Sequence, residues 1–208
     1  MPNWCNNSLE LNHPDPAMIA KVNDAFFVKK ALFEEFAPVP EALKIVAGQA
    51  GGFGTPEQLA LEAQEEANIA SYGYANWYDY CVDEWGTKWD VGAEDHDYDP
   101  LTEGSTQTVI WFESAWSPPL AFYNKLRDLG FHVQGYYYEP GIGFCGTWID
   151  GNDWECDLTD MTAEQVREAI PNALDEAFSI SENIAGYEDE DEVIFTLECD
   201  LSPKDPNE

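Results

Sequence analysis

The chain contains very few basic residues. Of its 208 residues, 9 are Lys or Arg and 41 are Asp or Glu, which gives a formal net charge of -32 at pH 7. A protein that binds phosphates needs a patch of Lys and Arg, so this balance disfavours direct binding of DNA or RNA. Solubility alone needs a net charge of about 2 to 8 in magnitude, and additional charge costs self-repulsion. The surplus therefore predicts a function for the acidic surface.

Long apolar runs are also missing. The first residues, MPNWCNNSLELN, lack the basic segment and the apolar stretch of a signal peptide. No later run approaches the roughly 18 apolar residues of a membrane span. We therefore expect a cytoplasmic location and no membrane partner.

Motifs of metal and cofactor chemistry are absent as well. The five cysteines are widely spaced and form no C-x-x-C pair, which predicts free thiols and no zinc site. The three histidines form no H-E-x-x-H pattern, and no G-x-S-x-G elbow is present. The glycine-rich segment 48–54 lacks the Lys of a phosphate loop and reads as a flexible connector. We expect no catalytic residues and no cofactor.

One acidic run has the beginning of a calcium loop. Asp95, Asp97 and Asp99 stand at alternate positions, as the first ligands of such a loop do. However, Pro100 stands where the loop needs Gly, and Thr106 stands where it needs Glu. We therefore expect a solvated acidic loop and no metal site.

Enough apolar residues remain for a folded body, since 44% of the chain is hydrophobic and 14% is aromatic. The hydrophobic patterns predict strands and helices in the order β-α, a helical insertion, and β-α-β-β. This order predicts an α+β fold with a ferredoxin-like antiparallel sheet of four strands and helices on one face. The ferredoxin-like domain would span residues 1–150 with its insertion at about 48–90. Residues 151–208 would form an acidic helical C-terminal extension with a last strand at 193–199, packed on the same domain.

Four separated segments carry a family resemblance: MPNWCNN at 1–7, NWYDYCVDEWGTKWD at 76–90, WFESAWSPP at 111–119 and YYYEPGIGFCG at 136–146. Over about residues 1–150 the chain resembles the YubB-type ferredoxin-like proteins of bacteriophages and conjugative plasmids. The resemblance implies a ferredoxin-like domain and a protein of a mobile element that acts inside a host cell. It implies no activity for individual residues.

The acids are concentrated in the last part of the chain. Residues 150–208 hold 19 acids and 2 bases, whereas residues 104–149 hold 3 acids and 2 bases. A folded monomer of this mass exposes about 10,000 Å², or one net charge per about 300 Å². Duplex DNA carries one charge per about 100 Å². Clustering of acids on residues 79–103 and 150–208 would bring those faces close to the charge density of DNA.

Such a face predicts a non-catalytic protein that mimics the charge of DNA. Its partner would be a host DNA-binding defence protein or nuclease, blocked in the manner of an anti-restriction or anti-CRISPR inhibitor. The acids expected to bind the partner are Asp150, Asp153, Glu155, Asp157, Asp160, Glu164, Glu168, Asp175, Glu176, Glu188, Asp189, Glu190, Asp191, Glu192, Glu94, Asp95, Asp97 and Asp99. If they share a helix, Asp160, Glu164 and Glu168 would form one row, because they are spaced by four.

Three alternatives remain open. Trp85, Lys88, Trp89 and Trp116 would line one pocket in a ligand-binding or enzymatic ferredoxin-like domain, where aromatic rings and a Lys hold a base or a phosphate. The acids would serve a different protein interaction in a second alternative. Salt adaptation would also explain the composition, although acids should then coat every segment, and residues 104–149 are nearly neutral.

Overall fold

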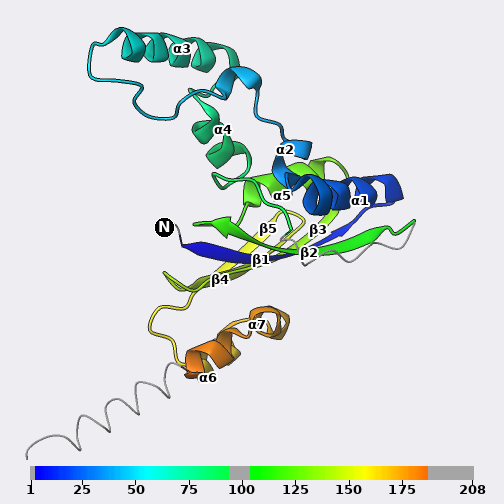
Figure 1. The fold of residues 1–208 in the computed structure, drawn as a ribbon. Coiled ribbons are helices and arrows are strands. Elements are labelled where there is room, and N and C mark those ends of the chain that lie inside the picture. The colour runs from blue at the N-terminus through cyan, green and yellow to red at the C-terminus, as the bar shows by residue number, and fades with distance from the viewer. Residues whose placement is uncertain (1–2, 94–103, 187–208) are drawn as a thin grey trace, which may run out of the picture.

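A five-stranded antiparallel sheet forms the centre of the protein (Figure 1). The structure is a computed structural model that describes residues 3–93 and 104–186. The strand order is β2-β1-β3-β4-β5. The strands are β1 (Trp4–Asn12), β2 (Gln107–Ala115), β3 (His132–Glu139), β4 (Phe144–Ile149) and β5 (Asn152–Asp157).

Seven α-helices and two short helical turns accompany the sheet within the described residues. The α-helices are α1 (Pro16–Asn23), α2 (Leu32–Phe36), α3 (Pro56–Tyr72), α4 (Trp77–Glu84), α5 (Leu120–Asp128), α6 (Ala163–Ala169) and α7 (Asn172–Phe178). The turns are a π-helical segment, Asp24–Lys29, and a 3-10 segment, Glu41–Leu43. Helical residues also run from 180 to 186. Helices α1 and α3 both begin with a residue whose side chain caps the helix, Asp15 or Thr55, followed by Pro, an arrangement that favours a helix start.

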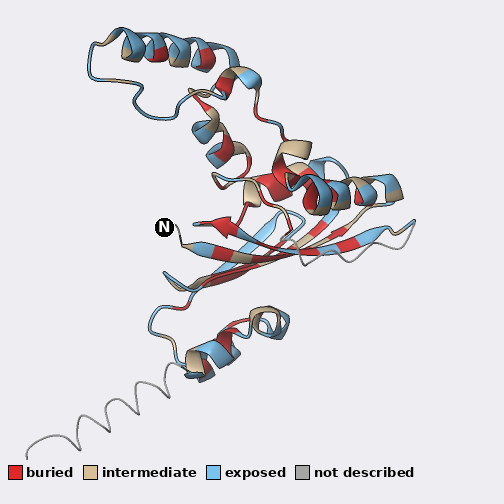
Figure 2. Ribbon diagram, viewed as in Figure 1, coloured by how far each residue is buried: buried red, intermediate tan, exposed pale blue. Residues whose placement is uncertain are grey.

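The helices that precede β4 lie on one side of the sheet, and α6 and α7 lie on the other (Figure 1). Alternate strand residues such as Leu9 and Val133 enter the larger core with Phe33 and Phe122. The opposite face has a smaller core in which β3 and β4 meet the two last helices. Its buried members are Tyr138, Cys145, Leu158, Val166, Ile170, Leu174 and Ile180. Buried positions therefore follow both faces of the central strands (Figure 2).

The α+β, ferredoxin-like class is confirmed, with an antiparallel sheet whose β2, α5 and β3 form a β-α-β unit around β1. The helical insertion is confirmed by α3 and α4, which lie inside residues 48–90. Helix α3 projects away from the sheet (Figure 1). The strand expected at 193–199 lies outside the described residues. No helix in the described ranges is long and apolar enough to cross a membrane.

The sheet has one strand more than the sequence predicts. Residues 152–157 pair with β4 as an edge strand, so the expected boundary at residue 150 falls inside a β-hairpin. Asp150 and Gly151 both have positive φ, 47° and 97°, as the two central residues of a type I′ turn require. A mostly exposed edge strand has no apolar face to reveal it, but the Asp-Gly pair signals this turn.

Candidate functional site: acidic surface and aromatic cleft

The new edge strand gathers three of the predicted acids. Asp153, Glu155 and Asp157 alternate along β5, so their side chains share one face of the sheet, and all three are exposed. The hydroxyl of Tyr137 reaches across Gly146 of β4 and donates to Asp153 at 2.9 Å. Hydrogen bonds from Thr159 lower the pKa of Asp157, so this carboxylate stays charged near neutral pH. We name these three residues the β5 acid row.

A second pair of acids lies on α6. Glu164 and Glu168 are exposed and four residues apart on this short helix, whose N-terminus Thr162 caps. Asp160 lies before the helix, in a left-handed conformation with φ 59°. Only two of the three carboxylates predicted to form one row are therefore on the helix. The helix packs against the face of the sheet opposite to the β5 acid row. The predicted acidic surface is therefore divided between two sides of the β5 edge.

Two of the predicted partner-binding acids make local structural bonds. Asp150 accepts from the backbone N–H of Val133 at 2.9 Å and also contacts His132 beside the hairpin turn. Asp175 accepts from the backbone N–H and the hydroxyl of Ser181, each at 2.7 Å. Glu176 is exposed. These bonds give Asp150 and Asp175 a structural role in the fold, and the side chain of Asp150 remains 38% exposed.

The remaining predicted acids lie outside the described residues. They are Glu94, Asp95, Asp97, Asp99, Glu188, Asp189, Glu190, Asp191 and Glu192. Among the described residues, no group of three or more His, Cys, Asp and Glu side chains is arranged to hold a metal ion.

Cations compensate the acids unevenly. Near α1, α2 and α4, Lys29 pairs with Glu35 at 2.8 Å, Lys44 pairs with Glu34 at 3.1 Å, and Lys125 contacts Glu84. Residues 150–186 contain ten acids and one base, Arg167, a net charge of -9. Within that described stretch no Lys or Arg forms an ion pair with an acid of the β5 acid row or of α6. The charge of this region is therefore largely uncompensated, as is that of α3, which contains four acids and no base.

The average charge density remains below that of DNA. An accessible surface of 12462 Å² shared by 32 net charges gives one charge per about 390 Å², against about 100 Å² for the duplex. The charge density of the β5 acid row is higher than this average, because alternate residues of a strand lie only about 6.8 Å apart. Mimicry of DNA would therefore depend on local rows of carboxylates and not on the average charge density of the surface.

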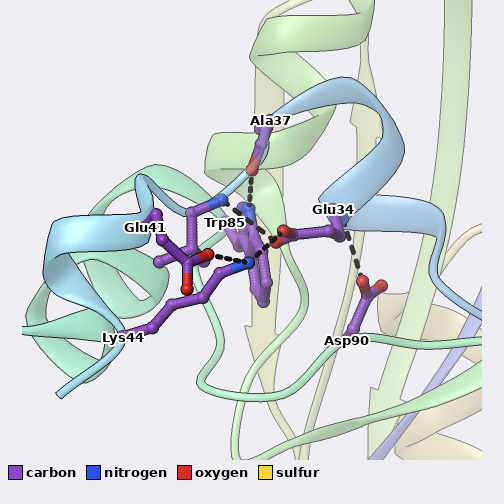
Figure 3. A network of polar contacts seen from close by, with 7 residues as sticks. Glu34, Ala37, Glu41, Lys44, Trp85 and Asp90 are labelled. Atoms are coloured by element: carbon purple, nitrogen blue, oxygen red, sulfur yellow. Dashed lines mark hydrogen bonds and ion pairs between the residues drawn. The ribbon is translucent and has the colours of Figure 1, made fainter.

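The predicted Trp and Lys pocket is dispersed. Trp85 is 4% exposed in the main core, where its indole N–H donates to the carbonyl of Ala37 at 2.9 Å (Figure 3). The Lys88 ammonium lies 3.8 Å from the centre of the Trp89 ring. Trp116 is half exposed after the end of β2. Because Trp85 faces the core, it cannot line a ligand pocket together with the other three.

Polar contacts around Trp85 hold the insertion against α2 (Figure 3). Asp90 accepts from the backbone N–H groups of Phe33 and Glu34 at 2.7 and 2.9 Å. The side chain of Glu34 in turn pairs with Lys44. The WGTKWD segment at 85–90 therefore has a structural role that explains two of its residues, Trp85 and Asp90.

The structure shows a different cavity, which the sequence did not predict. It has a volume of about 800 Å³ and lies at the end of β1 and β2, next to α7. Its lining includes two half-exposed indoles, Trp4 and Trp111, together with Phe178 and Glu113. We call it the aromatic cleft. In the sequence, only the alternation of Trp111 and Glu113 on β2 indicated this cleft. Their approach to Trp4 and Phe178 depends on strand register and on the packing of α7.

Comparisons with known proteins do not indicate a function for this chain. No family model and no curated protein matches this chain. Among solved structures, the chain is similar to the crystal structure of protein Api92 from Yersinia pseudotuberculosis, described under the family model DUF1281. The similarity covers 76% of this chain and 98% of that one, at 11% identity and a TM-score of 0.39. A similarity this distant carries no argument about function.

Proposed function

We propose that this protein is a non-catalytic inhibitor that presents a DNA-like negative surface to a host DNA-binding defence protein or nuclease. The observation that supports this function best is the β5 acid row, whose carboxylates are exposed and unpaired with any Lys or Arg of the described residues. The resemblance to proteins of phages and plasmids favours a target in host defence. The partner surface would be the basic channel that normally holds DNA.

The spacing of the carboxylates sets the strength expected of this mimicry. The β5 acid row carries one charge about every 6.8 Å, which is roughly half the linear density of one DNA strand at 3.4 Å per phosphate. One row therefore gives partial mimicry. The acids of α6 add charge on the other side of the edge strand. A basic partner would gain electrostatic steering, and its affinity would fall as salt rises.

Two simpler explanations compete with this proposal. Charged residues on an edge strand prevent sheet-to-sheet aggregation, so the β5 acid row has a protective use in any case. Salt adaptation also stays open, because the nearly neutral residues 104–149 form β2, α5, β3 and β4, which supply many of the buried core residues. A core segment has few charges whether the acids arise from mimicry or from salt adaptation, so this segment does not distinguish the two origins. Helix α3 is also acidic, and it supplies a control.

The test is capture of host proteins by the immobilised full chain at low salt, followed by elution with duplex DNA. We expect DNA-binding proteins that duplex DNA displaces. The Asp153→Asn, Glu155→Gln, Asp157→Asn variant should capture less of them. A matched variant of three exposed acids on α3, Glu57→Gln, Glu62→Gln, Glu66→Gln, should capture as much as the unmodified protein.

Two results would contradict the proposal. One is capture of no protein that duplex DNA displaces. The other is an equal loss of capture in both triple variants, which would indicate a general effect of net charge. Matching urea midpoints of the two variants would show that both remain folded.

A further inference from the structure

The aromatic cleft combines half-exposed aromatic rings with a carboxylate, Glu113, that forms no ion pair in the described part of the chain. Trp4 is 42% exposed and Trp111 is 52% exposed, although an indole contributes most when it is buried. Phe178 of α7 meets the Trp111 ring at an interplanar angle of 78°, with the ring centres 5.7 Å apart. The cleft of about 800 Å³ lies against these rings. The rings therefore form a wall that the protein itself leaves partly open.

Strand register places the carboxylate between the two indoles. Glu113 pairs with Asn6 across the strands, while Trp111 pairs with Ser8 and Trp4 pairs with Ala115. Because these side chains alternate along the strands, Trp4, Glu113 and Trp111 share one face of the sheet. Glu113 is exposed and forms no ion pair within the described residues. Its charge is therefore available to a ligand in the cleft.

The chain already stacks a cation beside this cleft. The Lys88 ammonium lies 3.8 Å from the centre of the Trp89 ring, and that ring lies 5.9 Å from the ring of Trp4. Electron-rich indole faces attract cations, and the attraction grows where water is partly excluded. The net charge of -32 raises the concentration of cations near the surface as well.

We propose that the aromatic cleft binds an arginine side chain of the basic partner protein, an inference that rests on the proposed function. A guanidinium is planar and weakly hydrated, so it can stack on an indole of Trp4 or Trp111 while it donates to the carboxylate of Glu113. A neutral apolar ligand would leave this carboxylate without a partner. A lysine lacks the planar group that stacks on a ring.

The test uses ethylguanidinium as the probe, followed through the indole N–H signals of Trp4 and Trp111 in NMR spectra of the full chain. We expect saturable shifts of both signals. Ethylurea, which has nearly the same shape and no charge, should not produce them. Trp111→Leu should lower the affinity for ethylguanidinium by about fivefold or more, because the variant loses a cation–π contact with a partly desolvated ring. Glu113→Gln should lower it as well.

The control is Trp154→Leu, which removes an indole of similar exposure from the same face of the sheet, outside the lining of the cleft. This variant should bind ethylguanidinium as the unmodified protein does. Absence of saturable shifts, equal shifts with ethylurea, or an equal loss in the Trp154 variant would overturn the inference. The same spectra report whether each variant is folded.

The probe needs no partner, so its result separates this inference from the proposed function. For a partner captured as described above, Trp111→Leu should weaken binding. Phe53→Leu, at an exposed position before α3 that lies outside both the aromatic cleft and the β5 edge, should not. Partner binding that depends on the β5 acid row but is unchanged by Trp111→Leu would contradict only the arginine site. Saturable binding of ethylguanidinium without any partner that duplex DNA displaces would contradict only the proposed function.

Discussion

At the scale of single residues, Asn7 joins β1 to its surroundings through its side chain. Its amide donates to the carbonyl of Cys5 at 2.7 Å and to the hydroxyl of Ser114 at 2.9 Å. Its oxygen accepts from the fully buried hydroxyl of Tyr123 at 3.2 Å. A buried amide with these partners fixes the position of α5 over the strands. These contacts give one residue of the MPNWCNN segment a structural role.

Replacing Asn7 should therefore destabilise the fold. We expect Asn7→Leu to lower the free energy of unfolding by about 2 to 3 kcal/mol, because the Tyr123 hydroxyl would lose its acceptor in the core. Urea unfolding measures this change. Asn172→Ala, on an exposed position of α7, should change stability by less than about 0.5 kcal/mol. An equal effect of the two substitutions would contradict the role assigned to Asn7.

Gly146 allows Tyr137 to cross β4 and reach Asp153. A Cβ at this glycine would lie 2.3 Å from the Tyr137 ring and 2.4 Å from the backbone oxygen of Trp154. We expect Gly146→Ala to cost about 1 to 3 kcal/mol of stability, because strand backbone cannot move aside as a flexible side chain can. Gly52→Ala, where a Cβ meets only ordinary contacts, is the control. Thermal unfolding of both variants checks this, and an unaltered Gly146→Ala midpoint would contradict it.

At the scale of elements, Asp90 caps the N-terminus of α2 from the distant end of the insertion. Its carboxylate accepts from the backbone N–H groups of Phe33, Glu34 and Val91. We expect Asp90→Ala to cost about 1 to 2 kcal/mol, the usual loss for a helix cap. Asp79→Ala, an exposed acid of α4, should cost less. Urea midpoints of the two variants test this, and a stable Asp90→Ala protein would show that the cap does not hold the insertion.

The same residue should give stability a dependence on pH. Burial raises the pKa of Asp90 from 3.8, although the three N–H donors oppose the rise. The folded chain then holds this proton more tightly than the unfolded chain, so its contribution falls as pH rises from 3.8 through the folded-state pKa. We expect Asp90→Asn to lack this part of the pH slope in unfolding measurements. An identical slope in both proteins would contradict the raised pKa.

Most elements could be predicted from the sequence because their signals are local. The Asp15-Pro16 and Thr55-Pro56 pairs mark the starts of α1 and α3. The edge strand β5 was missed because an exposed polar strand has no apolar alternation, although Asp150 and Gly151 signalled its turn. The burial of Trp85 and the assembly of the aromatic cleft depend on packing between distant elements, which local spacing does not determine.

At the scale of the whole molecule, the ion pairs are concentrated in one part of the surface. Most of those in the described residues lie around α1, α2 and α5, whereas the acids of α3 and of the β5 acid row form none there. The edge at β5 and the helices after it carry ten acids and one base over residues 150–186. An uncompensated edge costs self-repulsion, which is consistent with a surface that a cationic partner covers.

The most direct test of the central claim is the dissociation constant of a captured DNA-binding partner for three proteins at one low salt concentration. These are the unmodified chain, the variant with a neutralised β5 acid row, and the variant neutralised at Glu57, Glu62 and Glu66 on α3. We predict an increase of roughly tenfold or more for the β5 variant, as loss of about 1.4 kcal/mol implies, and little change for the α3 variant. Equal constants for the two variants would contradict the claim that the β5 edge is the binding surface.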